Sequence, residues 1–147
     1  MEIEVIQNKI FEIRGCKVML DFDLALLYNV KTKVFKQSVR RNINRFPEDF
    51  MFELTEVEFN SLRLQIVTSN RGGLRYMPFA FTEQGIAMLS SVLNSDKAIE
   101  VNISIITAFV TFRQFSLTYS ELKDRIAAIE SQFAPPVHLY RLVSRHI

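Results

Sequence analysis

Few residues of this chain could carry acid–base or metal chemistry near neutral pH. Its two histidines, His138 and His146, both follow Pro135-Pro136 near the end of the 147 residues, and its single cysteine is Cys16. The spacing of these side chains matches no zinc motif, because no close pair of cysteines or histidines brings ligands together. Short-range carboxylate pairs are more typical of helix starts and solvated surface than of catalytic dyads. We therefore expect no catalytic residue and no metal.

Glycine loops that cradle phosphates are also missing from the sequence. The four glycines form neither a Walker A pattern nor the glycine pattern of dinucleotide-binding folds. Apolar residues make up 48% of the chain and charged residues 23%, which is enough for one folded core. We expect a non-enzymatic protein without a cofactor.

The sequence does concentrate positive charge. Residues 31–46 contain six lysines and arginines and no acid, whereas residues 47–60 contain five acids and no base. A basic cluster is the footprint of a protein that binds a polyanion such as nucleic acid. The alternative is an amphipathic helix with a solvated basic face. We favour binding, because six cations without a compensating acid repel one another.

A single helix is predicted to carry this cluster. It runs from an N-cap at Thr32 to about Phe46, where Pro47 stops it. Its buried stripe, at spacings of four, four and three, comprises Phe35, Val39, Ile43 and Phe46. The opposite face is polar and comprises Lys33, Gln37, Arg40, Arg41 and Asn44.

The segment before it predicts a short helix through Tyr28, capped by Asp21 or Asp23 and ended by Asn29. A short helix, a tight turn and a polar second helix are typical of a helix-turn-helix, whose second helix enters the major groove of DNA. Glutamine and asparagine can recognise adenine, whereas arginine and lysine can recognise guanine or neutralise phosphates. The predicted DNA-binding residues are Lys31, Thr32, Lys33, Lys36, Gln37, Arg40, Arg41, Asn44 and Arg45.

Other patterns predict β-hairpins and further helices, and therefore an α+β fold. Residues 9–20 predict a hairpin around Gly15, and residues 50–54 a strand followed by a helix that opens with a capping box at 55–58 and runs to about Arg63. Residues 64–68 and 74–81 predict a second hairpin. Arg71 and Arg75 at its tip are a possible secondary DNA contact, although a mobile polar loop is the commoner explanation. Thr82 is expected to cap a helix that runs to about Leu93.

The C-terminal region predicts a long helix from about Asp96 to Phe133, capped by Ser95 or Asp96. Apolar residues from Val101 onward recur at alternating spacings of four and three, which is a heptad pattern. At about 1.5 Å per residue this helix is about 57 Å long, so we expect its distal half to project and to join two chains. The alternative is two helices broken near residues 116–120 and packed back on one monomer. The predicted dimerisation residues are Phe112, Phe115, Tyr119, Leu122, Ile126, Ile129 and Phe133.

This organisation divides the chain into a DNA-binding domain at 1–115, a helical extension at 116–134 and a short tail at 135–147. The acidic N-terminus lacks the pattern of a secretory signal, and the longest apolar-rich run, 103–112, is too short to span a bilayer. We expect a soluble cytoplasmic protein without a membrane partner.

Longer motifs resemble a known family. They resemble the N-terminal DNA-binding domain of the ORF-six-N group, which belongs with the KilA-N and Bro-N domains of phage antirepressors and large DNA viruses. The resemblance reaches about Arg113 and is carried by Ile13–Asp21, Asp23–Tyr28, Val39–Ile43, Arg45–Thr55, Gly73–Gly85 and Met88–Ser95. It implies a non-enzymatic DNA-binding module of a phage or mobile-element regulator. Asn29 stands where the family usually has glycine, a change that the turn should tolerate.

Two functions follow from these observations as hypotheses. The first is a regulator that binds double-stranded DNA through the basic second helix as a homodimer. The second is an antirepressor that captures another transcription regulator without contacting DNA. Binding to DNA should weaken steeply with salt, whereas binding through an apolar protein interface should not.

Overall fold

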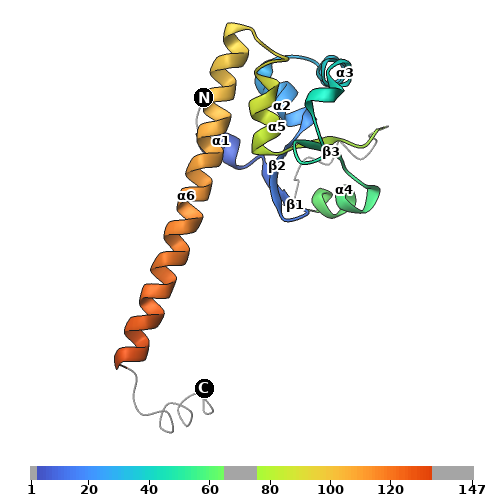
Figure 1. The fold of residues 1–147 in the computed structure, drawn as a ribbon. Helices are drawn as coiled ribbons and strands as arrows, with labels where there is room; N and C mark the ends of the chain where they lie inside the picture. Colours follow the sequence, from blue (N-terminus) through green and yellow to red (C-terminus); the bar gives the residue numbers. More distant parts are fainter. Residues whose placement is uncertain (1–2, 65–75, 134–147) are drawn as a thin grey trace. The chain divides into compact units, whose positions relative to one another are not determined.

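The computed structural model describes residues 3–64 and 76–133. It confirms an α+β fold, with helices and an antiparallel sheet (Figure 1). The chain divides into two compact units, Met1–Val110 and Thr111–Ile147. In chain order the elements are α1 (Ile3–Gln7), β1 (Ile10–Ile13), β2 (Cys16–Leu20), α2 (Asp21–Tyr28), α3 (Thr32–Arg41), the 3₁₀ helix η1 (Ile43–Arg45), β3 (Met51–Glu53), α4 (Glu56–Arg63), β4 (Phe79–Phe81), α5 (Glu83–Leu89) and α6 (Asp96–Phe133).

The four strands form one sheet in the order β1-β2-β4-β3, with every neighbouring pair antiparallel. The predicted hairpin of β1 and β2 is confirmed. Its two-residue turn places both Arg14 and Gly15 at positive φ, as a type I′ turn requires. The second predicted hairpin falls partly on residues 65–75, which lie outside the described residues. The strand that follows them, β4, lies between β2 and β3.

Strand alternation divides the core between the two faces of the sheet. Phe81 pairs with Met19 on one side and with Met51 on the other, and this row packs against α2, α3, α5 and the first turns of α6. Ala80 pairs in the same way with Leu20 and Phe52, and that row packs with α4. Adjacent residues of a strand point to opposite faces, so one short central strand contributes to both cores.

Most helix starts agree with the sequence pattern. Thr55 and Glu58 form the reciprocal hydrogen bonds of a capping box at the start of α4, and the Thr82 hydroxyl accepts from the Gly85 amide at the start of α5. Ser95 likewise accepts from the Ala98 amide, at 3.1 Å. The α5 helix ends at Leu89, short of the predicted Leu93.

Two predicted caps are wrong. Helix α2 starts at Asp21 after Leu20, and α3 starts at Thr32 after Lys31, with no side-chain hydrogen bond at either N-cap. Asp21 instead directs its carboxylate toward β4, where it accepts a hydrogen bond from the Phe79 amide at 2.9 Å. The Asp21 side chain, which the local pattern assigned to a helix cap, therefore makes tertiary contacts instead.

The helix predicted to reach Phe46 is also shorter in the structure. It ends at Arg41, and η1 follows after Asn42. Because the backbone leaves the α-helical path at Asn42, the buried stripe is interrupted: Phe35, Val39 and Phe46 are buried, but Ile43 is 49% exposed. The prediction of Ile43 as a core residue is therefore wrong.

The predicted long helix is confirmed: α6 is a single helix from Asp96 to Phe133, and the alternative of two helices broken near residues 116–120 is not found. In the first unit, its buried residues Val101, Ile105 and Ala108 belong to the main core. Across residues 3–64 and 76–133, no helix combines the length and the apolar character needed to cross a membrane.

Candidate nucleic-acid interface

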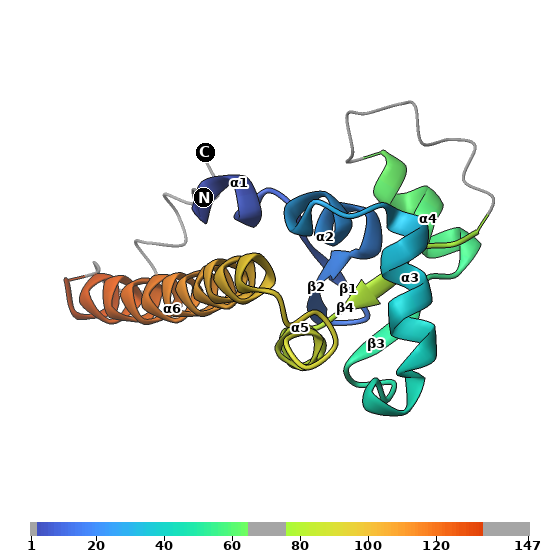
Figure 2. The ribbon, with the colours of Figure 1, turned by 90° about the horizontal axis from the view of Figure 1, so that it is seen from above.

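The turn between α2 and α3 has the geometry that a helix-turn-helix needs. Only residues 29–31 separate the two helices, which Figure 2 shows running in different directions from this short connection. Asn29 adopts the left-handed conformation, with φ 59° and ψ 44°, and its amide donates to the Leu26 carbonyl at 3.1 Å. The Val30 amide donates to the Ala25 carbonyl at 3.0 Å. These bonds satisfy carbonyls at the end of α2, and asparagine tolerates the positive φ.

Aromatic packing fixes α3 on the sheet. Phe35, fully buried on the inner face of α3, stacks on Tyr28 of α2 with ring centroids 6.1 Å apart and meets Phe81 of β4 edge-on at 5.5 Å. Phe46 contacts the same Phe81 ring edge-on at 5.8 Å. The inner face of α3 is thus held by rings from α2 and β4, and its outer face is left to solvent.

The outer face holds most of the predicted DNA-binding residues. Those that the structure leaves exposed are Lys31, Lys33, Gln37, Arg40, Arg41, Asn44 and Arg45, whereas Thr32 is half-buried. Asn44 and Arg45 lie on η1, beyond the end of α3. No ion pair joins any of the five exposed cations to an acid within residues 3–64 and 76–133.

Lys36, also predicted to contact DNA, does not lie on that face. Its side chain is buried, and its ammonium lies 3.4 Å from the Asp21 carboxylate and donates to the Met77 carbonyl at 3.1 Å. It also lies 4.4 Å from the centroid of the Phe79 ring, which is within the range of a cation–π interaction. Its role in the structure is to anchor α3 to α2 and β4.

Burial raises the pKa of the Asp21 carboxyl above its ordinary value of 3.8, and the Phe79 amide and the Lys36 ammonium only partly oppose that effect. Sequence reasoning missed this anchor. The helical wheel could have indicated it, because at 3.6 residues per turn Lys36 lies only about 60° from the buried Val39 and therefore next to the buried stripe. The guanidinium of Arg40 lies at the edge of the anchor, 5.4 Å from the Phe79 ring centroid.

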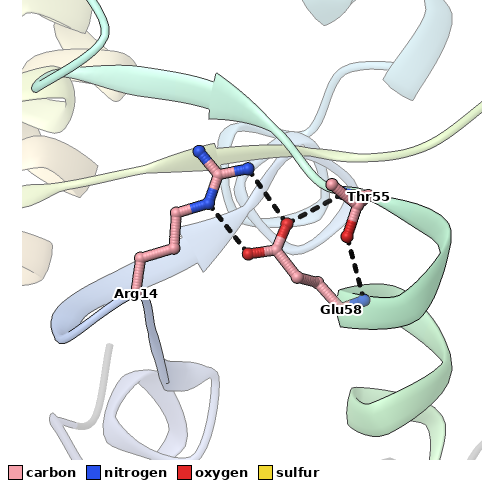
Figure 3. Close-up of polar contacts among 3 residues, drawn as sticks. All are labelled: Arg14, Thr55 and Glu58. Carbon is pink, nitrogen blue, oxygen red and sulfur yellow. Dashed lines mark hydrogen bonds and ion pairs between the residues drawn. The ribbon is translucent and has the colours of Figure 1, made fainter.

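The acidic residues that follow the basic cluster lie mostly on the surface. Glu48, Asp49, Glu53 and Glu56 are exposed. Glu58 receives two hydrogen bonds from the Arg14 guanidinium, at 2.8 and 3.0 Å, and one from the Thr55 amide (Figure 3). These bonds, led by that from Arg14, lower the pKa of Glu58 to about 2. The pair ties the β1–β2 turn to α4 and plays no part in the basic face.

The predicted dimerisation residues lie in the unit that begins at Thr111. Phe112 is half-buried, and the seam residues that follow it are exposed: Phe115, Tyr119, Leu122, Ile126 and Ile129. The side chain of Phe133 lies outside the described residues, as do Arg71 and Arg75, the predicted secondary DNA contact. Among the residues that the structure describes, no three histidines, cysteines or acids cluster as metal ligands would.

Comparison with known proteins identifies the family. The ORF6N domain model matches residues 8–92, which is more than half of the 147 residues and includes α2, α3 and η1. No curated protein and no solved structure matched the chain. The chain therefore belongs to the ORF6N domain family, and this membership indicates a phage-type regulatory protein.

Proposed function

We propose that this protein is a non-enzymatic regulator that binds double-stranded DNA through the outer face of α3 and η1. The observation that carries the proposal is the set of exposed cations at 31–45 without an acidic partner in the described residues: Lys31, Lys33, Arg40, Arg41 and Arg45. Concentrated, unpaired positive charge costs self-repulsion in the free protein, and phosphate groups relieve it.

The shape of the unit supports the same proposal. An α-helix fits the major groove of B-DNA, and in a helix-turn-helix the second helix enters it while the first crosses the backbone. Helix α3 follows α2 after three residues, and rings of α2 and β4 hold its inner face. Its exposed polar side chains can therefore meet base edges without any rearrangement of the core.

The experiment is a titration of a random-sequence duplex with the full chain at 50 and 200 mM salt. Each phosphate neutralised contributes about 0.9 to the slope of log affinity against log salt, so five contacts predict a slope of about −4.5. For one bound chain, affinity should then fall by about 500-fold between the two concentrations, and a dimer with both α3 helices on the duplex should respond more steeply. A slope near zero would contradict DNA binding.

Arg40→Ala with Arg41→Ala should retain the fold, because both side chains are exposed, and should weaken binding at least tenfold. The matched control is Arg63→Ala with Lys97→Ala, which removes the same charge from exposed positions on α4 and α6. Equal losses in the two variants would mean that only net charge matters and that α3 is not the interface.

We further propose that the protein acts as a homodimer joined through the exposed seam of α6. The seam places Arg125 and Glu130 at g and following e positions, where opposite charges favour a parallel pair. Two copies would present two α3 helices to two half-sites, and linking the two contacts raises the overall affinity.

Leu122→Lys with Ile126→Lys tests this assembly by sedimentation. The two side chains are 55% and 47% exposed, so a dimer could bury about half of each. Burial of that apolar surface stabilises the dimer by about 0.8 kcal/mol or more per side chain. Four such side chains per dimer predict a dissociation constant raised at least 100-fold. Leu117→Lys with Ser131→Lys adds the same charge at outer positions of the heptad and should leave the dimer intact. A wild-type monomer at tens of micromolar would refute the proposal.

The second candidate is an antirepressor that captures another regulator through the same apolar seam. The exposure of large side chains such as Phe115 and Leu122 favours it. Such a complex should respond little to salt and should survive loss of Arg40 and Arg41, so the titration above separates the two functions.

A further inference from the structure

One exposed side chain on the outer face of α3 is apolar. Val34 is 49% exposed, and its exposed neighbours on α3 are all polar: Lys33, Gln37, Arg40 and Arg41. It contributes nothing to the buried stripe of Phe35 and Val39. Valine is also a poorer helix former than lysine, glutamine or arginine, so helix stability does not account for it there. Val34 is therefore free to contact a ligand that binds the outer face of α3.

Val34 lies in the same row as Gln37 and Arg41. Residues three and seven positions apart share one face of a helix, so these side chains follow one another along the outer face. The axial separation of Val34 and Gln37 is about 4.5 Å, close to the roughly 3.4 Å step between base pairs. Both residues belong to the first two turns of α3, and the N-terminal part of a recognition helix contacts base edges. The two side chains can therefore meet neighbouring base pairs.

The chemistry of the two side chains restricts what those base pairs are. A glutamine amide can both donate to and accept from adenine, at N6 and N7. A valine has no hydrogen-bonding group, and the one apolar feature in the major groove is the C5 methyl group of thymine. Lysine and arginine at 33 and 41 would serve guanine or phosphate equally well, and so they add charge without restricting the choice of A·T over G·C.

We propose that Val34 contacts a thymine methyl group next to an adenine bound by Gln37, so that α3 prefers sites with adjacent A·T pairs. This inference rests on the proposed function, since it specifies the sequence that the DNA-binding face recognises. It assigns specificity to Val34 and Gln37 and general affinity to the surrounding cations.

The test begins with repeated selection of a bound sequence from a random duplex library by the full-length wild-type protein. Each thymine of the selected duplex is then replaced in turn by deoxyuridine, which removes only the methyl group. At one position this replacement should lower the affinity of the wild type about fourfold, which is the effect of burying one apolar carbon. Val34→Ala should bind the thymine and deoxyuridine duplexes equally, and Val57→Ala, an exposed valine on α4, should behave as wild type.

The outcomes distinguish this inference from the function on which it rests. Two outcomes overturn the role of Val34 and leave DNA binding intact. In the first, binding depends on salt but deoxyuridine has no effect at any position. In the second, deoxyuridine weakens binding of Val34→Ala as much as binding of the wild type. A selected sequence without adjacent A·T pairs also overturns the role of Val34 and leaves DNA binding intact. A lack of binding to every duplex overturns the proposed function itself.

Discussion

Replacing Lys36 with methionine tests whether the buried ion pair beneath α3 holds that helix in place. Methionine has a similar length and a similar helix propensity, so the change removes the charge and little else. The lysine side chain is 10% exposed and that of Asp21 is 2% exposed, so the variant leaves a carboxylate in the interior without its cation.

The size of the effect follows from what Asp21 loses and keeps. Removing one partner of a buried pair typically costs about 3–5 kcal/mol, because the remaining charge stays desolvated. Asp21 still accepts the hydrogen bond from the Phe79 amide and can take up a proton, both of which reduce the loss. We expect the free energy of unfolding to fall by about 3 kcal/mol at pH 7, a large share of the 5–15 kcal/mol typical of a domain.

The loss should depend on pH in a defined direction. The folded-state pKa of Asp21 is already raised by burial, and removal of the lysine raises it further. A raised carboxyl pKa stabilises the fold below the unfolded-state value, near 3.8, and that contribution is lost as the pH rises through the folded-state value. The deficit of the variant should therefore be smaller at pH 4 than at pH 7.

Urea denaturation at the two pH values measures both effects. Lys33→Met, an exposed lysine on the same helix, should change stability by less than about 0.5 kcal/mol. Asp21→Asn combined with Lys36→Met should recover part of the loss, since it leaves no buried charge. A loss below about 1 kcal/mol at pH 7, a deficit independent of pH, or additive losses in the double variant would refute the argument.

Two further predictions concern the supports of the fold. Glu58→Gln removes a carboxylate whose pKa is about 2 and keeps an oxygen for the capping box. It should cause a small loss of thermal stability at pH 7 that shrinks as the pH falls through about 2, and an equal loss at all pH values would contradict a role for the Glu58 charge. Gly85→Ala should destabilise by about 3 kcal/mol or more in urea denaturation, because its Cβ would lie 2.0 Å from the Phe50 carbonyl oxygen. A near-wild-type midpoint would show that α5 can shift away from Phe50.

Local patterns predicted the fold where neighbours in sequence decide the structure. The β1–β2 turn, the capping box of α4, the Thr82 cap and the left-handed Asn29 each depend on a few adjacent residues. The sheet order was beyond such reasoning, because β4 joins strands that precede it by many residues. The cap expected from Asp21 failed for the same reason, since its carboxylate binds the Phe79 amide on β4 and the Lys36 ammonium on α3.

The exposed face of α3 could be predicted because helical periodicity separates Phe35 and Val39 from Lys33, Gln37 and Arg41. Periodicity failed at its two edges. Lys36 lies at the boundary of the stripe, where a long side chain can turn inward to an acid that the wheel does not contain. Ile43 lies beyond Arg41, where the backbone no longer follows the α-helical path and the wheel no longer applies.

The heptad pattern of α6 illustrates a different limit. Its spacing continues unchanged from Val101 to Phe133, but the structure buries Val101, Ile105 and Ala108 in the core of the first unit and leaves Phe115 onward exposed. The pattern records only that one side of the helix is apolar, and a domain core and a second helix satisfy that requirement equally well. The spacing of apolar residues does not change along α6, but the exposure of their side chains does. This change in exposure separates the part of α6 that stabilises the fold from the part available to a partner.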